Sequence, residues 1–78
     1  MTKLANRIIA DDNICNGKPI LNGKRITVQS ILEFLASGDS KEDILKQFPS
    51  LEPGDIEACL SFAATLLDRQ YTIKQQTV

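Results

Sequence analysis

The chain contains no histidine and no tryptophan, and only 5% of its residues are aromatic. Because histidine is the usual general base near neutral pH, its absence argues against most acid–base and nucleophilic catalysis. The closest carboxylate pairs, Asp11-Asp12 and Glu42-Asp43, lie at an expected turn and in an expected first helical turn, where structural roles suffice. No glycine-rich phosphate loop opens a helix. We therefore expect a binding protein and not an enzyme.

Cysteine is also scarce. Cys15 and Cys59 lack the Cys-x-x-Cys spacing of zinc sites, so the sequence predicts no metal site and no cofactor. Cys59 falls on an apolar helical face and is expected in the core, whereas Cys15 adjoins the turn-like Asn16-Gly17 and is expected at the surface. The sequence shows no leader peptide and no apolar run near the roughly 20 residues that cross a bilayer. These absences predict a cytoplasmic protein with reduced thiols and no membrane contact.

The length and charge of the chain suggest one small domain that associates. A domain of 78 residues is near the size at which a single core gives marginal stability, so we expect residues 1–78 to form one domain and a homodimer. Residues 1–30 carry five basic and two acidic side chains, a balance of +3, and residues 31–78 carry four basic and eight acidic ones, a balance of −4. A phosphate-facing surface would therefore come from the N-terminal part. Faces of opposite sign could equally drive head-to-tail association.

The N-terminal part predicts β-structure. Two short apolar pieces, Pro19–Leu21 and Arg25–Val28, flank Asn22-Gly23, a dipeptide that tolerates the positive φ angles of a tight turn. This pattern predicts a small β-hairpin. The β-branched character of Arg7–Ala10 predicts a short lead-in strand, and residues 1–5 are expected to be frayed.

From Thr27 onward the apolar period changes to about 3.6 residues, which predicts three helices. The expected ranges are Val28–Ser37 after an N-cap at Thr27, a second helix from Ser40 to Phe48, and Pro53–Gln70. The last helix carries a broad apolar stripe that suits either a central helix or a helix that also meets a partner chain: Ile56, Cys59, Leu60, Ala63, Leu66 and Leu67. Residues 71–78 could be a flexible tail or a segment that orders on a partner. The fold class is therefore mainly α with a short N-terminal β-hairpin, in a three-helix layout like a helix-turn-helix.

Several short motifs resemble a known bacterial family. They are Gly17-Lys18-Pro19-Ile20, Gly23-Lys24-Arg25-Ile26-Thr27-Val28, Ile31-Leu32, Leu35-Ala36, Gly38, Phe48-Pro49-Ser50-Leu51 and Asp55-Ile56. In this order they resemble the family called domain of unknown function 433, over residues 8–67. The resemblance implies a homeodomain-like helix-turn-helix fold and, as for some members, a likeness to VapB-type antitoxins that pair with a PIN-like ribonuclease toxin. This chain departs from the pattern at Glu52, where threonine is common, and at Asn16, where glycine is usual.

DNA binding would depend on cations of the N-terminal part. The start of the last expected helix offers Glu52, Asp55 and Glu57, and phosphates repel carboxylates, so that helix is a poor groove reader. If DNA is bound, we expect four basic residues to carry the phosphate contacts: Arg7, Lys18, Lys24 and Arg25. The same cluster could be a solvated hairpin tip, and Arg25 could instead pair with an acidic residue beneath the hairpin.

Protein binding is the competing hypothesis. An acidic helical half suits a basic partner such as a ribonuclease. We expect the partner surface on the last helix and the tail: Glu52, Asp55, Glu57, Leu66, Leu67 and Tyr71. Together with this charge, the family resemblance implies an antitoxin-like protein that neutralises a PIN-like ribonuclease and that, as a dimer, could bind operator DNA. The alternatives are a stand-alone helix-turn-helix transcription regulator and an interaction module without DNA binding.

Overall fold

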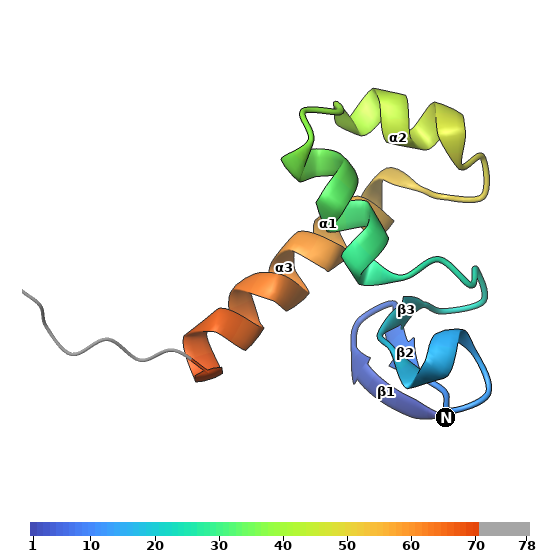
Figure 1. The fold of residues 1–78 in the computed structure, drawn as a ribbon, viewed down its shortest axis with the longest axis vertical. Coiled ribbons are helices and arrows are strands. Elements are labelled where there is room, and N and C mark those ends of the chain that lie inside the picture. Colours follow the sequence, from blue (N-terminus) through green and yellow to red (C-terminus); the bar gives the residue numbers. More distant parts are fainter. Residues whose placement is uncertain (71–78) are drawn as a thin grey trace, which may run out of the picture.

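The computed structural model describes residues 1–70, with the side chains of residues 1–68. Its elements in chain order are β1 (Thr2–Ala5), β2 (Ile8–Ala10), a 3-10 turn (Cys15–Gly17), β3 (Ile20–Leu21), α1 (Val28–Ala36), α2 (Lys41–Gln47) and α3 (Pro53–Gln70). The three helices gather beside a small N-terminal sheet, and the outer turns of α3 extend away from α1 and α2 (Figure 1). The expected mainly α fold with a short N-terminal β-structure is confirmed. The helix-turn-helix assignment stays a prediction.

The sheet is antiparallel with the strand order β1-β2-β3. Its first strand overturns the expectation that residues 1–5 are frayed, because Lys3 pairs with Ile9 and Ala5 pairs with Ile8. Three of the four residues of β1 are exposed, so the strand shows no apolar alternation that the sequence could reveal. Backbone pairing with the buried strand β2 holds β1 in place.

The predicted hairpin is present mainly as its turn. Gly23 adopts a φ of +79°, and the N–H of Lys24 donates to the carbonyl of Leu21 over 3.0 Å. The expected second strand is wrong, because Arg25 has a left-handed φ of 54° and α1 begins only three residues later. Of the expected second strand, only an isolated β-bridge between Thr27 and Ile20 is present. The strand β3 pairs with β2 instead.

The helix boundaries follow the predicted caps. Thr27 Oγ1 accepts the N–H of Ser30 over 3.0 Å at the start of α1, and Gly38, with φ of +100°, follows its end. Ser40 and Asp43 form a capping box at the start of α2. The bounds of α3 are those predicted.

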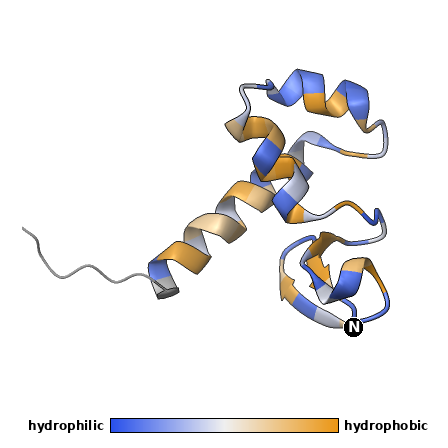
Figure 2. Cartoon of the chain, viewed as in Figure 1, coloured by the Kyte–Doolittle hydropathy of each residue, from blue (hydrophilic) through white to orange (hydrophobic). Residues whose placement is uncertain are grey.

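The core includes only the first half of α3. Eight buried side chains form one cluster: Ile8, Leu21, Val28, Ile31, Ile44, Leu51, Ile56 and Cys59. Farther along α3, Leu60, Leu66 and Leu67 are 42%, 40% and 58% exposed. Figure 2 shows hydrophobic colour continuing to the outer part of α3, beyond the packed helices. The predicted apolar stripe of α3 is therefore buried at Ile56 and Cys59 and exposed at Leu66 and Leu67.

Candidate binding surface

Asp55 joins the start of α3 to the sheet. It is 3% exposed, and its Oδ2 accepts the backbone N–H of Glu52 over 2.8 Å, just before the helix begins. Its Oδ1 accepts Arg7 Nη1 over 3.0 Å, and its Oδ2 accepts Lys24 Nζ. Arg7 lies in the turn between β1 and β2, and Lys24 follows β3. One carboxylate therefore caps α3 and fixes two separate turns against it.

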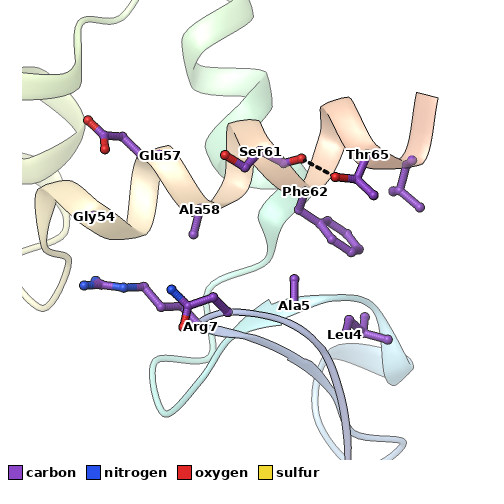
Figure 3. Close-up of a pocket in the computed structure, with 11 residues that line it drawn as sticks. Leu4, Ala5, Arg7, Gly54, Glu57, Ala58, Ser61, Phe62 and Thr65 are labelled. Carbon is purple, nitrogen blue, oxygen red and sulfur yellow. Dashed lines mark hydrogen bonds between the residues drawn. The ribbon is translucent and has the colours of Figure 1, made fainter. Parts of the chain in front are cut away.

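Arg7 reaches Asp55 from an unusual backbone position. Its φ is +70°, a conformation that costs free energy for a residue other than glycine. Its guanidinium also contacts Glu52 Oε1 at 3.1 Å and lies against the first turn of α3, where a Cβ on Gly54 would come within 2.8 Å of Arg7 Cζ. Figure 3 shows the guanidinium of Arg7 beside Gly54. The absent side chain at Gly54 is what makes this approach possible.

The contacts between Asp55 and its neighbours favour the charged forms of Asp55 and Arg7. Burial alone would raise the pKa of Asp55, but hydrogen bonds from Lys24, the Glu52 N–H and Arg7 together lower this pKa below its usual value. The hydrogen bond to Asp55 is the main cause of the raised pKa of Arg7. Two cations and two carboxylates, those of Asp55 and Glu52, therefore face one another. Their charges cancel, which leaves little net charge for a phosphate.

The predicted DNA-binding residues thus divide into two pairs. Arg7 and Lys24 meet at Asp55, so their charges are already compensated. Lys18 and Arg25 are exposed and form no ion pair within the described part of the chain. The pairing considered for Arg25 with an acid beneath the hairpin is made by Lys24 instead.

The predicted partner-binding residues also separate. Glu52 and Asp55 are engaged with Arg7 as described, and Asp55 is buried, so it cannot present a surface carboxylate. Glu57 is exposed and lies 3.7 Å from Lys41, a solvated pair of small energetic weight.

Leu66 and Leu67 remain as exposed apolar side chains on α3. Tyr71 lies outside the described residues.

Two hollows lie along α3. The first, with a volume of about 420 Å³, lies between α3 and the turn that joins β1 to β2. Figure 3 shows Phe62 above Ala5 and Leu4, with Ser61 and Thr65 on the same helix. The Thr65 hydroxyl donates to the Ser61 carbonyl over 3.0 Å, so it is already used within the helix. This hollow mixes apolar and polar side chains.

The second hollow, here called the α1–α3 groove, has a volume of about 390 Å³ and an almost wholly apolar lining. Its lining residues come from α1, α3 and the residue that precedes β3: Pro19, Val28, Gln29, Leu32, Glu33, Ala36, Phe62, Ala63 and Leu66. Leu66 was expected at a partner surface, but Leu32 and Phe62 were not. Leu32 belongs to the apolar period of α1, and this period does not distinguish a core position from a position in a groove.

A family model and a solved structure both match this chain. A family model described as a protein of unknown function, DUF433, matches residues 8–63, which is more than half of the chain. The chain belongs to the DUF433 family. A crystal structure of a DUF433 member protein from Anabaena variabilis ATCC 29413 superposes with a TM-score of 0.74 at 22% sequence identity. The match covers 83% of this chain and 67% of that chain, and it shows that the two proteins share a fold. No curated protein matches the chain.

Because DUF433 is a family of unknown function, the function of this chain is inferred from its surface. Within residues 1–70, none of the helices combines the length and apolar character that a membrane span requires. The outer half of α3 and the α1–α3 groove are apolar surfaces that the described fold leaves uncovered.

Proposed function

We propose that this DUF433 chain is a protein-binding module that acts as an antitoxin does, by holding a basic PIN-like ribonuclease inactive. The observation that carries the proposal is the apolar outer half of α3, where Leu66 and Leu67 are 40% and 58% exposed beside the α1–α3 groove. Burial of apolar surface drives most protein association, and large side chains next to a concave apolar surface are typical contact points. A partner that covers this region would remove both leucines from water.

The charge of the helical part supports a basic partner. Residues 31–78 carry four basic and eight acidic side chains, and Glu33 is an exposed acid in the lining of the groove. A ribonuclease must attract RNA phosphates with a positive surface, and such a surface is complementary to this net charge of −4. An acidic protein that covers a nuclease would compete with its substrate.

Operator binding has less support. Arg7 and Lys24, half of the expected phosphate contacts, are compensated by Asp55 and Glu52. The start of α3 presents Glu57 and no basic side chain within its first turns. The regulator hypothesis therefore depends on Lys18 and Arg25, and the homodimer stays a prediction.

The test is capture of the partner by the tagged full chain from the source cells, after nuclease treatment, with mass spectrometry. Two leucines on α3 give a matched pair, because Leu66 lines the groove and is 40% exposed, whereas Leu60 lines neither hollow and is 42% exposed. We expect a stoichiometric small nuclease to be captured by the native chain and by Leu60→Gln. Leu66→Gln should weaken binding about 30-fold, the effect of a contact worth about 2 kcal/mol.

Two results would contradict the proposal. Capture of DNA without a protein would favour the regulator. Equal binding of the nuclease by Leu66→Gln and Leu60→Gln would remove the outer half of α3 from the contact.

A further inference from the structure

Two asparagine–glycine pairs lie in the N-terminal part, Asn16-Gly17 and Asn22-Gly23. In such a pair the backbone nitrogen of the glycine can attack the side-chain amide carbon of the asparagine, because glycine carries no Cβ that shields its nitrogen. Both asparagines are exposed. The sequence therefore contains two similar sites for one reaction, and the fold distinguishes them.

The backbone nitrogen of Gly17 is held by the 3-10 turn. Its N–H donates to the carbonyl of Ile14 over 3.1 Å, and the next N–H, of Lys18, donates to the carbonyl of Cys15 over 3.1 Å. Cys15, Asn16 and Gly17 have positive φ angles of 51°, 57° and 77°. Attack by the Gly17 nitrogen would have to break its own hydrogen bond and rotate the backbone out of this turn.

The backbone nitrogen of Gly23 is accessible. No backbone carbonyl of the described residues accepts the Gly23 N–H, and beyond its two chain neighbours nothing lies within 4 Å of the position that a Cβ on Gly23 would take. One hydrogen bond closes the turn, from the Lys24 N–H to the carbonyl of Leu21 over 3.0 Å, and it does not involve the attacking nitrogen. Asn22 can therefore react at a smaller cost in hydrogen bonds than Asn16.

The reaction needs no reactant other than water. The Gly23 nitrogen forms a bond to Asn22 Cγ, the Cγ–Nδ2 bond breaks, and the proton of the Gly23 N–H leaves with the amide group as ammonia. Water then opens the cyclic imide. Cleavage of the bond between nitrogen and Cγ gives aspartate, whereas cleavage of the bond between nitrogen and the main-chain carbonyl carbon gives isoaspartate, whose backbone runs through Cγ.

The turn at Asn22 connects to the contacts that join the sheet to α3. The backbone N–H of Asn22 donates to the carbonyl of Arg7 over 2.9 Å, and Lys24 pairs with Asp55. Isoaspartate adds one carbon to the backbone between Leu21 and Lys24, so it changes the distance that the turn must span. Aspartate adds the same carboxylate and leaves the backbone length unchanged.

We propose that Asn22-Gly23 is a site of spontaneous deamidation in the folded chain, and that its isoaspartate product weakens the contact of Lys24 with Asp55. The reaction modifies the chain itself and is independent of the partner in the proposed function. It converts a neutral amide beside the Arg7–Asp55–Lys24 contacts into a carboxylate.

The test compares the two asparagines within one molecule. The full chain is incubated at pH 8 and 37 °C, either folded or in guanidinium chloride, and digested with trypsin. Residues 8–24 form one peptide with both sites, because trypsin does not cut between Lys18 and Pro19, and fragment masses give the deamidated fraction at each. In the folded chain we expect Asn22 to convert at least about fivefold faster than Asn16, the ratio for one additional hydrogen bond that must break. In guanidinium chloride the two rates should become similar.

Thermal melts test the effect of the product. Chromatography separates the isoaspartate form, and Asn22→Asp is its matched control, with the same carboxylate on an ordinary backbone. We expect the isoaspartate form to have a Tm lower than that of Asn22→Asp by about 4–8 °C, the shift for one lost contact in a domain of this size. Asn22→Gln should show no conversion at residue 22, because its longer side chain would have to close a larger ring.

Three results would overturn the inference. Conversion of Asn16 as fast as Asn22 in the folded chain would show that the fold does not select the second pair. A rate ratio in guanidinium chloride as large as that in the folded chain would assign the selection to the local sequence. An isoaspartate form as stable as Asn22→Asp would refute the effect on the contact between Lys24 and Asp55.

Discussion

Removal of the Asp55 carboxylate should strongly destabilise the fold. Asp55→Ala deletes the acceptor of three hydrogen bonds, from the Glu52 N–H, Arg7 and Lys24. Loss of one partner from a buried charged network costs about 3–5 kcal/mol when the remaining charges stay buried. Here the side chains of Arg7 and Lys24 are 39% and 20% exposed and can regain water, so the expected cost falls to about 2–3 kcal/mol.

This cost is a large part of the total stability. A chain of 78 residues is stable by about 4–12 kcal/mol, and each kcal/mol lowers the Tm of such a domain by about 4–8 °C. We therefore expect Asp55→Ala to lower the Tm by about 10–20 °C, measured by circular dichroism together with urea unfolding. Asp43 is the matched control, because it occupies the same capping position in α2 but is exposed and forms no ion pair within the described residues. Asp43→Ala should cost about 1 kcal/mol, and a cost for Asp55→Ala no larger than this would refute the reasoning.

The same network predicts a pH dependence. The folded state lowers the pKa of Asp55 below its unfolded value of about 3.9, so the charged form favours folding. This contribution is fully present above about pH 5 and is lost as the pH falls through the folded pKa. The free-energy difference between the native chain and Asp55→Asn should thus be constant from pH 6 to 8 and shrink below about pH 4. An unchanged difference at low pH would show that the carboxylate charge contributes nothing.

Two further predictions concern Gly54 and the thiols. In a chain that already carries Arg7→Ala, Gly54→Ala should raise the Tm, because alanine favours a helix more than glycine does. In the native chain the same substitution should raise the Tm less or lower it, because the new Cβ meets the guanidinium of Arg7. Equal changes in Tm in both chains would show that the two residues are not coupled. A thiol reagent at neutral pH should label only Cys15 in the folded chain, because Cys59 is buried and its pKa is raised to about 11 by burial and by the charge of Asp55. Both thiols should react in urea. Rapid reaction of Cys59 in buffer would contradict the core described above.

The helices could be predicted from local signals, whereas the ion-pair network could not. Thr27, Gly38 and Pro53 mark helix ends through interactions within a few residues, so the sequence located all three helices closely. Asp55 contacts Arg7 and Lys24 across 48 and 31 residues of chain, and no local pattern contains such pairings.

The predictions for the β-structure were partly wrong for related reasons. Arg7 and Arg25 take positive φ angles that arginine rarely adopts, so nothing in the sequence signals those turns. The apolar stripe of α3 was recognised, but periodicity does not tell how far a core extends along a helix. The division between buried Cys59 and exposed Leu66 depends on where α1 and β1 lie.

The most direct test of the central claim is the RNA cleavage activity of the captured partner, titrated with the purified chain. If this DUF433 protein neutralises a ribonuclease through the α1–α3 groove, cleavage should fall in proportion to added chain and end at a fixed molar ratio. Leu60→Gln should reproduce this titration, and Leu66→Gln should need far more protein. Undiminished cleavage at a saturating excess of the native chain would contradict the account.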